Sequence, residues 1–303
     1  MKRIFLSILA IILLLSSDVS YVFASEIIPI STIDYNKIPE TPEGMYHYLF
    51  VCVDNWEADI NTPGNTDGMV LITLDTNSKH ILFTSFMREM LIERPEGGPG
   101  RLTYILKDNT PEDLMKTLST HFGIKIEKYI IFNMNDIQQI IDSIGGVNLT
   151  ITDEEAEYLH NYSIRPDSTI PNLDKGGTYL FNGHGSVIYG RIRKVGGTGD
   201  AGRTSRIRNI LYSLVEQMSK ATFEDALGLI NFVISNKMDT NLEMADMLET
   251  VGYALELINV TPEGIQMPPD EARTRVFYSG MDTQSVDFDK SRKILHDFLF
   301  KNN

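Results

Sequence analysis

The hydrophobic pattern in the first third of the chain predicts three β-strands. Residues 45–53, 68–75 and 79–86 are rich in β-branched and aromatic side chains, as half-buried strands are. The last two stretches are separated by Thr76-Asn77-Ser78, which are residues that favour a tight turn. We therefore predict a β-hairpin whose two strands lie side by side.

A helix with clear ends is predicted further along the chain. Thr110 can cap it, Pro111 suits its first position and Gly123 ends it, with apolar residues on one face in between. The pattern then alternates, with a strand at residues 124–132, a helix at 135–144 and a strand at 147–151. Such alternation indicates an α/β fold. We expect three layers, α-β-α, with a central mixed β-sheet and helices on both faces.

The pattern in the second half of the chain is mainly helical. Residues 187–192 predict a strand, which leads into the glycine-rich segment Gly196-Gly197-Thr198-Gly199. Apolar residues then recur at steps of three and four as far as Met218, which is typical of a long amphipathic helix. Further helices are predicted at residues 223–234, 241–258 and 289–300, and short strands at 275–278 and 285–288.

The N-terminus has the pattern of a secretory signal peptide. Lys2 and Arg3 precede an apolar run, residues 4–15, that is shorter than the ~20 residues a membrane-spanning helix needs. We predict a signal peptide at residues 1–24, with an uncleaved N-terminal membrane anchor as the alternative. Residues 25–44 predict a linker, and residues 45–303 a single domain with a core at 45–220 and an extension at 221–303. The mature protein is expected outside the cytoplasm.

Charge and cysteine content exclude several classes of protein. Lys and Arg number 27 against 41 Asp and Glu, a formal net charge of -14, which argues against a nucleic-acid partner. The single cysteine, Cys52, excludes an internal disulfide and any cysteine-based zinc site. It stands in an apolar run, where a buried thiol is favoured over a nucleophile. The histidines show no metal-ligand spacing, and no G-x-S-x-G or Ser-His-Asp pattern is present.

Basic residues are concentrated between positions 191 and 208. They are Arg191, Arg193, Lys194, Arg203, Arg206 and Arg208. Arg191 and Arg193 would point the same way at the end of a strand, and Arg203 and Arg206 would share a face in the first turn of a helix. Guanidinium groups beside a glycine-rich loop and a helix N-terminus suit a phosphate or pyrophosphate. The alternative is a solvated basic face, but first-turn arginines oppose the helix dipole, which favours the anion site.

Two aspartates stand at the ends of neighbouring predicted strands. Asp54 follows the first strand and Asp67 precedes the second. Paired carboxylates suit Mg²⁺, which usually also bridges to substrate phosphates. On spacing alone, a turn-forming role for these residues is favoured over a metal site. Arg88-Glu89 adds a cation near the same edge, and a surface ion pair is the alternative there.

Several segments match the motifs of one known family in the same order. They are Asn65-Thr66-Asp67-Gly68-Met69, Ser85-Phe86-Met87-Arg88-Glu89, Arg101-Leu102-Thr103, Asp142-Ser143-Ile144-Gly145-Gly146-Val147, Gly190-Arg191-Ile192-Arg193 and Gly199-Asp200-Ala201-Gly202-Arg203-Thr204-Ser205-Arg206. In these segments the chain resembles the LytR-CpsA-Psr proteins, which are extracytoplasmic, membrane-associated enzymes of mostly Gram-positive bacteria.

The resemblance implies a phosphotransferase that moves an anionic glycopolymer from a polyprenyl-pyrophosphate carrier onto peptidoglycan at the membrane surface. It also raises pyrophosphatase as a side activity. Mg²⁺ would be held by Asp54 and Asp67, and the pyrophosphate would be bound by Arg88, Arg101, Arg191, Arg193, Arg203 and Arg206. The prenyl tail would lie in an apolar tunnel between sheet and helices, with residues 207–218 as a wall. Asp54 or Glu89 would accept the proton of the acceptor hydroxyl.

The chain departs from the family's motifs at several positions. Asn65 replaces an arginine, Thr103 an asparagine and Ile207 a glutamine, and a proline-arginine-aspartate run reads Met87-Arg88-Glu89. One aligned donor to a transition-state oxygen contributes about 3 kcal/mol, so such losses would slow the reaction. The alternative function is therefore a weakly active or non-catalytic protein that binds polyprenyl pyrophosphate or cell-wall polymer. A transcriptional regulator is disfavoured, because the chain is acidic and is predicted to be exported.

Overall fold

The structure is a computed structural model, and it describes residues 27–55, 64–161, 173–196, 199–218, 223–235 and 238–301. The predicted signal peptide, residues 1–24, lies outside the described residues. In chain order the strands and helices are β1 Met45–Val53, β2 Thr66–Asp75, β3 His80–Phe86, β4 Leu91–Glu93, β5 Pro99–Arg101, α2 Ile105–Asp108, α3 Pro111–Phe122, β6 Lys128–Phe132, α4 Met134–Ser143, β7 Val147–Ile151, α5 Asp153–His160, β8 Gly177–Phe181, α6 Gly183–Gly190, α7 Gly199–Met218, α8 Phe223–Ser235, β9 Asp239–Thr240, α9 Met244–Glu256, β10 Glu263–Met267, β11 Arg273–Tyr278, β12 Met281–Val286 and α10 Phe288–Leu299.

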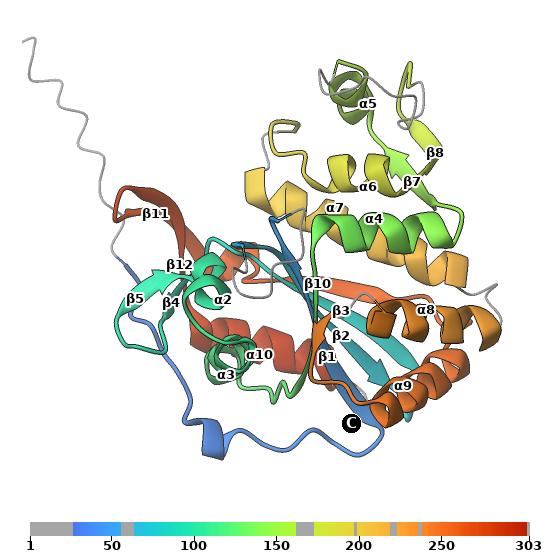
Figure 1. The fold of residues 1–303 in the computed structure, drawn as a ribbon. Coiled ribbons are helices and arrows are strands. Elements are labelled where there is room, and N and C mark those ends of the chain that lie inside the picture. Colours follow the sequence, from blue (N-terminus) through green and yellow to red (C-terminus); the bar gives the residue numbers. More distant parts are fainter. Residues whose placement is uncertain are drawn as a thin grey trace, which may run out of the picture.

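A mixed six-stranded sheet forms the centre of the molecule (Figure 1), in the order β10-β3-β2-β1-β6-β9. The first three strands form an antiparallel meander, whereas β6 runs parallel to β1 and β10 parallel to β3. The predicted hairpin of β2 and β3 is confirmed. Asp75 closes its turn, because the Asp75 carboxylate accepts hydrogen bonds from the backbone N–H groups of Asn77 and Ser78.

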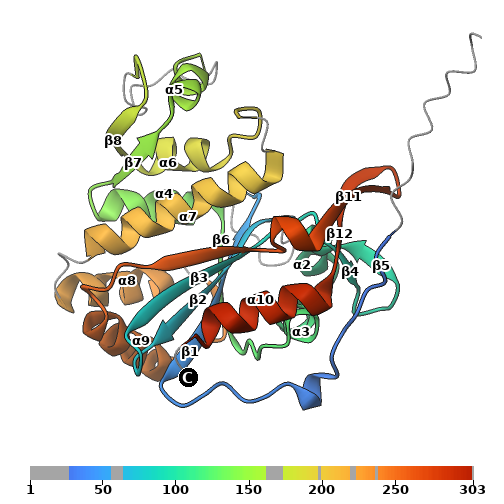
Figure 2. The same cartoon turned by 180° about the vertical axis from the view of Figure 1, so that it is seen from behind.

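Helices α3 and α10 cover one face of the sheet (Figure 2). Alternate β1 residues, Leu49, Val51 and Val53, point into this layer. Helix α3 begins as predicted, because Thr110 and Asp113 exchange side-chain-to-backbone hydrogen bonds in a capping box. It ends at Gly123, whose φ of 70° is a left-handed conformation that favours glycine.

Helices α7, α8 and α9 cover the opposite face. Here the other β1 residues, such as Tyr48, pack with Val70 of β2 and Phe83 of β3 against the apolar sides of these helices. Both faces of the sheet are therefore buried, which confirms the three-layer α-β-α architecture. A separate cluster at the top of Figure 1 joins the antiparallel pair of β7 and β8 to α5 and α6.

The predicted strand at residues 187–192 is wrong, because this segment belongs to helix α6 and the turn after it. The Asn182 side chain accepts a hydrogen bond from the Gly185 N–H and so starts a helix, and a short apolar run fits either type of structure. Arg191 caps this helix, so it does not share a strand face with Arg193. Helix α7 begins at Gly199, which puts Arg203 beyond the first turn. The helix-dipole argument for the arginines therefore does not apply.

The described part of the predicted linker, residues 27–44, packs against the domain. The Ile33 N–H donates to the Thr120 carbonyl of α3 at 2.8 Å, and Arg292 of α10 donates to the Ser31 carbonyl at 3.1 Å. Ile38 is buried. In the part of the chain that the structure describes, no helix has both the length and the apolar character needed to cross a membrane.

Acidification is expected to destabilise the fold through two buried histidines. Burial lowers the pKa of His47 and of His121 to about 4 from the ordinary 6.5. His121 Nε2 also accepts a hydrogen bond from the Glu93 N–H, which protonation of that nitrogen would break. The unfolded state therefore binds more protons between pH 6.5 and pH 4, so the free energy of unfolding falls as the pH is lowered through this window. Each ring contributes up to about 3 kcal/mol to that fall.

Urea unfolding between pH 7 and pH 4.5 tests this expectation. We expect His121→Gln to flatten the loss of stability with acidification, because the glutamine side chain, unlike that of His121, gains no proton on unfolding. His296→Gln, at an exposed position of α10, is the matched control. Equal acid slopes in the wild type and His121→Gln would contradict the expectation.

Candidate active site

Asp67 is presented by an irregularity in the central sheet. Val53 of β1 pairs with Thr66 of β2, but the preceding residue Cys52 pairs with Gly68. Asp67 is therefore the extra residue of a β-bulge, a feature that re-aims a side chain and is frequent beside active sites. Two hydrogen bonds fix this point of the strand, because Thr103 Oγ1 donates to the Thr66 carbonyl at 2.9 Å and Thr66 Oγ1 donates to the Thr103 carbonyl at 3.3 Å.

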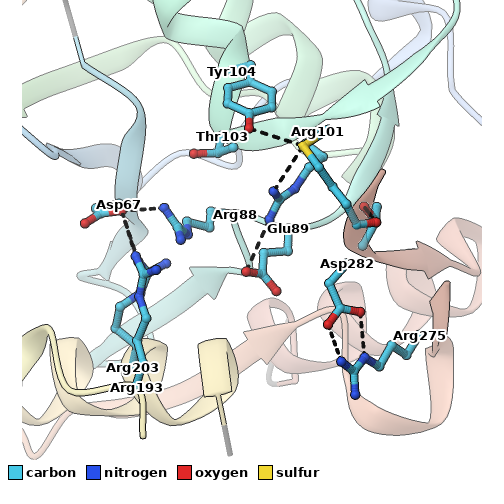
Figure 3. A network of polar contacts seen from close by, with 12 residues as sticks. Asp67, Arg88, Glu89, Arg101, Thr103, Tyr104, Arg193, Arg203, Arg275 and Asp282 are labelled. Carbon is cyan, nitrogen blue, oxygen red and sulfur yellow. Dashed lines mark hydrogen bonds and ion pairs between the residues drawn. The ribbon is translucent and has the colours of Figure 1, made fainter. Parts of the chain in front are cut away.

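Three arginines converge on the buried carboxylate of Asp67 (Figure 3). Arg88 Nη1 donates to Asp67 Oδ1 at 2.6 Å, and Arg203 Nη1 donates to the same oxygen at 3.0 Å. Arg193 Nη2 lies 3.7 Å from it. Arg203 is buried, whereas the side chain of Arg193 is 49% exposed, so Arg193 faces solvent. The structure thus brings together residues from β2, the end of β3, the segment after α6, and α7.

Arg206 lies outside this cluster. Its Nε donates to Glu155 of α5 at 2.6 Å, and its Nη1 donates to the Ile192 carbonyl at 2.9 Å. Both charged side chains are buried. The structure therefore engages Arg206 in holding the segment of Arg191 and Arg193 between α5 and α7. Glu155 is not among the residues that the sequence singled out, and its one local signal is its part in the capping box of α5.

Arg101 and Glu89 form a second ion pair next to the cluster. Arg101 Nη2 lies 3.2 Å from Glu89 Oε1, and both side chains are largely buried. Glu89 directly follows Arg88, whose carbonyl accepts a hydrogen bond from the Thr103 N–H at 3.0 Å. Arg101 therefore makes its carboxylate contact with Glu89, whereas Arg88 makes its contact with Asp67.

Asp54 lies at the end of β1 beside Asn65. Asn65 Nδ2 donates to Asp54 Oδ2 at 3.1 Å, and the Asp54 N–H donates to the Asn65 carbonyl at 2.9 Å. A Cβ at Gly64 would lie 2.3 Å from Asp54 Oδ1, so a larger residue there would require the Asp54 side chain to move. Asn65 Oδ1 is buried and has no hydrogen-bond donor among the described residues.

This donor set fits a hard cation, because carboxylate and amide oxygens are the ligands that Mg²⁺ takes. The buried Asn65 Oδ1 next to Asp54 is the observation that supports the fit. Among the described residues, no group of three or more His, Cys, Asp or Glu side chains gathers as a metal site would. Any magnesium ion would therefore also rely on water or substrate oxygens, as this ion usually does.

A long apolar cavity of about 430 Å³ starts at the arginine cluster. Asp67, Arg191 and Arg203 are charged members of its lining, which is otherwise almost entirely apolar. The cavity follows β2 from Gly68 past Val70 and Ile72 to Leu74, which is ~20 Å at the rise of a strand. The helices that enclose it, together with the central sheet, are α4, α6, α7, α8 and α9.

The cavity confirms the predicted tunnel between sheet and helices. Ile207, Leu211 and Val215 of α7 form part of its wall, as expected. Helices α8 and α9, which follow Met218, extend this wall. Ile207 lies near the charged end of the cavity. It packs close to Gly68, where an added Cβ would lie 3.0 Å from Ile207 Cδ1.

Cys52 is a partly buried thiol and not a nucleophile. It lines the cavity, and its Sγ lies 3.9 Å from the sulfur of Met134. Burial raises the pKa of the Cys52 thiol to about 12, because the thiolate would be desolvated. The thiol therefore stays protonated at neutral pH.

The model of the LytR_cpsA_psr family matches the chain over residues 30–294. The chain belongs to this family. The match covers the cluster, the cavity and the central sheet, and therefore confirms the resemblance of the motifs.

Two curated relatives show how far the similarity extends. Biofilm regulatory protein A of Streptococcus mutans is 26% identical over 63% of this chain, and the chain spans 48% of that relative's length. Polyisoprenyl-teichoic acid–peptidoglycan teichoic acid transferase TagV of Bacillus subtilis is 21% identical over 87% of this chain and 67% of its own length.

Solved structures share the fold. The crystal structure of TagV superposes with a TM-score of 0.66 at 19% identity, covering 86% of this chain and 98% of that one. The structure of TagT with bound octaprenyl pyrophosphate lipid gives a TM-score of 0.65 at 15% identity, covering 89% of this chain and 96% of that one. The three-layer fold is therefore that of LytR-CpsA-Psr proteins.

Proposed function

We propose that this protein transfers an anionic glycopolymer from a polyprenyl-pyrophosphate carrier to peptidoglycan, outside the cytoplasm of a Gram-positive-type bacterium. The observation that supports the proposal is the position of the arginine cluster at one end of the apolar cavity. Such a site matches a molecule with an anionic head and a long apolar tail. TagV carries the name of a teichoic acid transferase, and TagT is seen with octaprenyl pyrophosphate.

The arginines would bind and orient the pyrophosphate. Arg193 and Arg191, which are exposed, can turn toward a ligand, whereas Arg88 and Arg203 are held in place by Asp67. Planar guanidinium groups grip phosphate oxygens in pairs and stabilise the charge that develops on them during transfer. Because phosphoryl transfer depends mainly on positioning and charge neutralisation, this is most of the protein's task.

In the reaction, an oxygen of the acceptor hydroxyl would form a bond to the phosphorus next to the polymer. The bond from that phosphorus to the polyprenyl phosphate would break, and the polyprenyl phosphate would leave with its negative charge. The hydroxyl proton would pass to Asp54 or Glu89. Mg²⁺, held by Asp54, Asp67 and the Asn65 amide oxygen, would supply further neutralisation of phosphate charge.

Calorimetric titration of the full chain in detergent with octaprenyl pyrophosphate, with and without Mg²⁺, tests the proposal. An assay for transfer of lipid-linked polymer to peptidoglycan fragments then follows. We expect binding that Mg²⁺ strengthens, and turnover. Absence of binding would overturn the proposal.

Binding without turnover would support the second function, a carrier or sensor of lipid-linked pyrophosphate. One observation favours that function. Asn65 lacks the positive charge of the family's arginine, and Ile207, which lines the cavity, lacks the amide of the family's glutamine. The transfer assay therefore separates the two functions.

Arg193→Ala and Arg191→Ala are each expected to weaken pyrophosphate binding by about tenfold or more, which is about 1.4 kcal/mol. Both side chains are exposed in the free protein, so their removal should leave the melting temperature unchanged. Lys194→Ala, the neighbouring exposed cation, is the matched control and should retain affinity. Wild-type affinity in folded Arg193→Ala and Arg191→Ala would remove the arginine clamp from the proposal.

A further inference from the structure

The β11–β12 hairpin lies directly against the segment that carries Arg88 and Glu89. The Gln284 N–H donates to the Glu89 carbonyl at 2.9 Å, and Met90 forms a bridge with Gln284. The sulfur of Met281 contacts Arg101 Nη1 at 3.6 Å. The hairpin is thus joined to the candidate active site by both backbone and side-chain contacts.

One face of this hairpin presents a large exposed aromatic side chain. Phe277 pairs with Asp282 across the hairpin, and Arg275 pairs with Gln284, so these residues share one face. Phe277 is 76% exposed, the highest value among the large apolar side chains that the structure describes. Arg275 Nε donates to Asp282 Oδ1 at 2.6 Å beside it. The face therefore combines one exposed aromatic ring with a paired guanidinium and carboxylate.

Charges on this surface are paired and therefore nearly neutral. The hydrogen bond from Arg275, and more weakly the charge of Arg101, hold the pKa of Asp282 below its usual value. The pair of Glu89 and Arg101 therefore lies close to the pair of Arg275 and Asp282, as Figure 3 shows. A strongly anionic polymer gains little from such a surface, whereas a polar polymer of low charge can use its donors and acceptors.

The surface and the cavity approach the site from different sides. In Figure 3, Arg193 and Arg203 lie on one side of Arg88 and Glu89, and the hairpin with Asp282 lies on the other. The lining of the cavity includes Arg203 and other residues of α7, so the cavity lies on the first side. With a lipid-linked donor in the cavity, the hairpin side of the site would therefore stay open to the acceptor.

We propose that the β11–β12 face, which carries Phe277 near the turn of the hairpin and the Arg275–Asp282 pair beside it, is the acceptor subsite, and that it binds the glycan strand of peptidoglycan. The inference rests on the proposed transferase function. An aromatic ring offers an apolar face to the C–H side of a sugar ring, while guanidinium and carboxylate groups hydrogen-bond to hydroxyl and acetamido groups. The bound glycan would place a hydroxyl toward Glu89 and Arg88.

The test measures transfer kinetics with soluble peptidoglycan glycan fragments as acceptor. Phe277→Ala is expected to raise KM for the glycan by about tenfold and to leave kcat and KM for the lipid-linked donor unchanged. Phe277→Tyr, which keeps the ring, should restore the wild-type KM. Leu180→Ala, at another exposed apolar position (57% exposed) on β8, is the matched control. An unchanged KM for the glycan in Phe277→Ala, or a raised KM for the donor instead, would overturn the inference.

A direct binding measurement separates failure of the inference from failure of the proposed function. The full chain is titrated with glycan fragments alone and, separately, with octaprenyl pyrophosphate. Loss of glycan binding in Phe277→Ala, with octaprenyl pyrophosphate binding kept, supports the subsite. Glycan binding equal to that of the wild type in both Phe277→Ala and Asp282→Asn overturns the subsite, whatever the lipid titration shows. Absence of octaprenyl pyrophosphate binding to the wild type overturns the transferase function instead.

Discussion

The Asp67→Asn variant is expected to lose about 100-fold or more of its transfer activity. The Asp67 carboxylate is buried, and one of its oxygens takes contacts from Arg88, Arg193 and Arg203. A neutral amide in its place leaves these cations to repel one another and removes the group that fixes Arg88 and Arg203. The guanidinium groups would then no longer be pre-oriented for the pyrophosphate. The rate of transfer at saturating donor measures this loss.

The stability of this variant should fall together with its rate of transfer. Removing one partner of a buried ion pair costs about 3–5 kcal/mol, so the free energy of unfolding should also fall. Asp270→Asn is the matched control, because Asp270 pairs with Arg273 from a position that is 84% exposed. A folded Asp67→Asn variant that transfers polymer within about threefold of the wild-type rate would contradict a role for this carboxylate.

Arg206→Met is expected to lower the free energy of unfolding by about 3–5 kcal/mol. The change leaves the Glu155 carboxylate buried without the guanidinium that now donates to it at 2.6 Å. It also removes the hydrogen bond to the Ile192 carbonyl, which holds the segment before Arg193. Urea unfolding monitored by circular dichroism measures the change.

A second substitution should rescue much of this loss. Glu155→Gln removes the stranded charge and can still accept the cap hydrogen bond from the Thr152 N–H, so the double variant should be more stable than Arg206→Met alone. Lys79→Met, which breaks an exposed pair with Glu256, is the matched control and should change stability by less than about 1 kcal/mol. Equal free energies of unfolding for Arg206→Met and Lys79→Met would show that the buried pair stabilises the fold no more than the exposed pair does.

Local signals in the sequence were sufficient for the elements whose ends are fixed by nearby residues. Thr110, Asp113 and Gly123 define α3 by themselves, and the Asp75 turn defines the hairpin of β2 and β3. The same reasoning failed at residues 187–192, because a short apolar run fits a strand as well as a helix and the cap at Asn182 decides between them.

The site was predictable in its membership but not in its geometry. Ordered motifs singled out Asp67, Arg88, Arg193 and Arg203, and the structure brings these four residues together. Arg206 lies outside the cluster because it pairs with Glu155. That residue is 51 positions away in the sequence, and no local pattern encodes such a contact. The same holds for the β11–β12 hairpin, which carries Phe277 and contacts Glu89 through the Gln284 N–H because of the fold alone.

The apolar cavity has a consequence for the reaction cycle. A prenyl tail is chemically the same before and after transfer, so the cavity would hold the spent carrier through the same apolar contacts as the substrate. Contacts that are equal in substrate, transition state and product bring no gain in the chemical step. Departure of the spent lipid would then set the pace of turnover, as product release does in many enzymes. A bilayer or detergent micelle that takes up the tail would act as the sink that frees the enzyme for its next cycle.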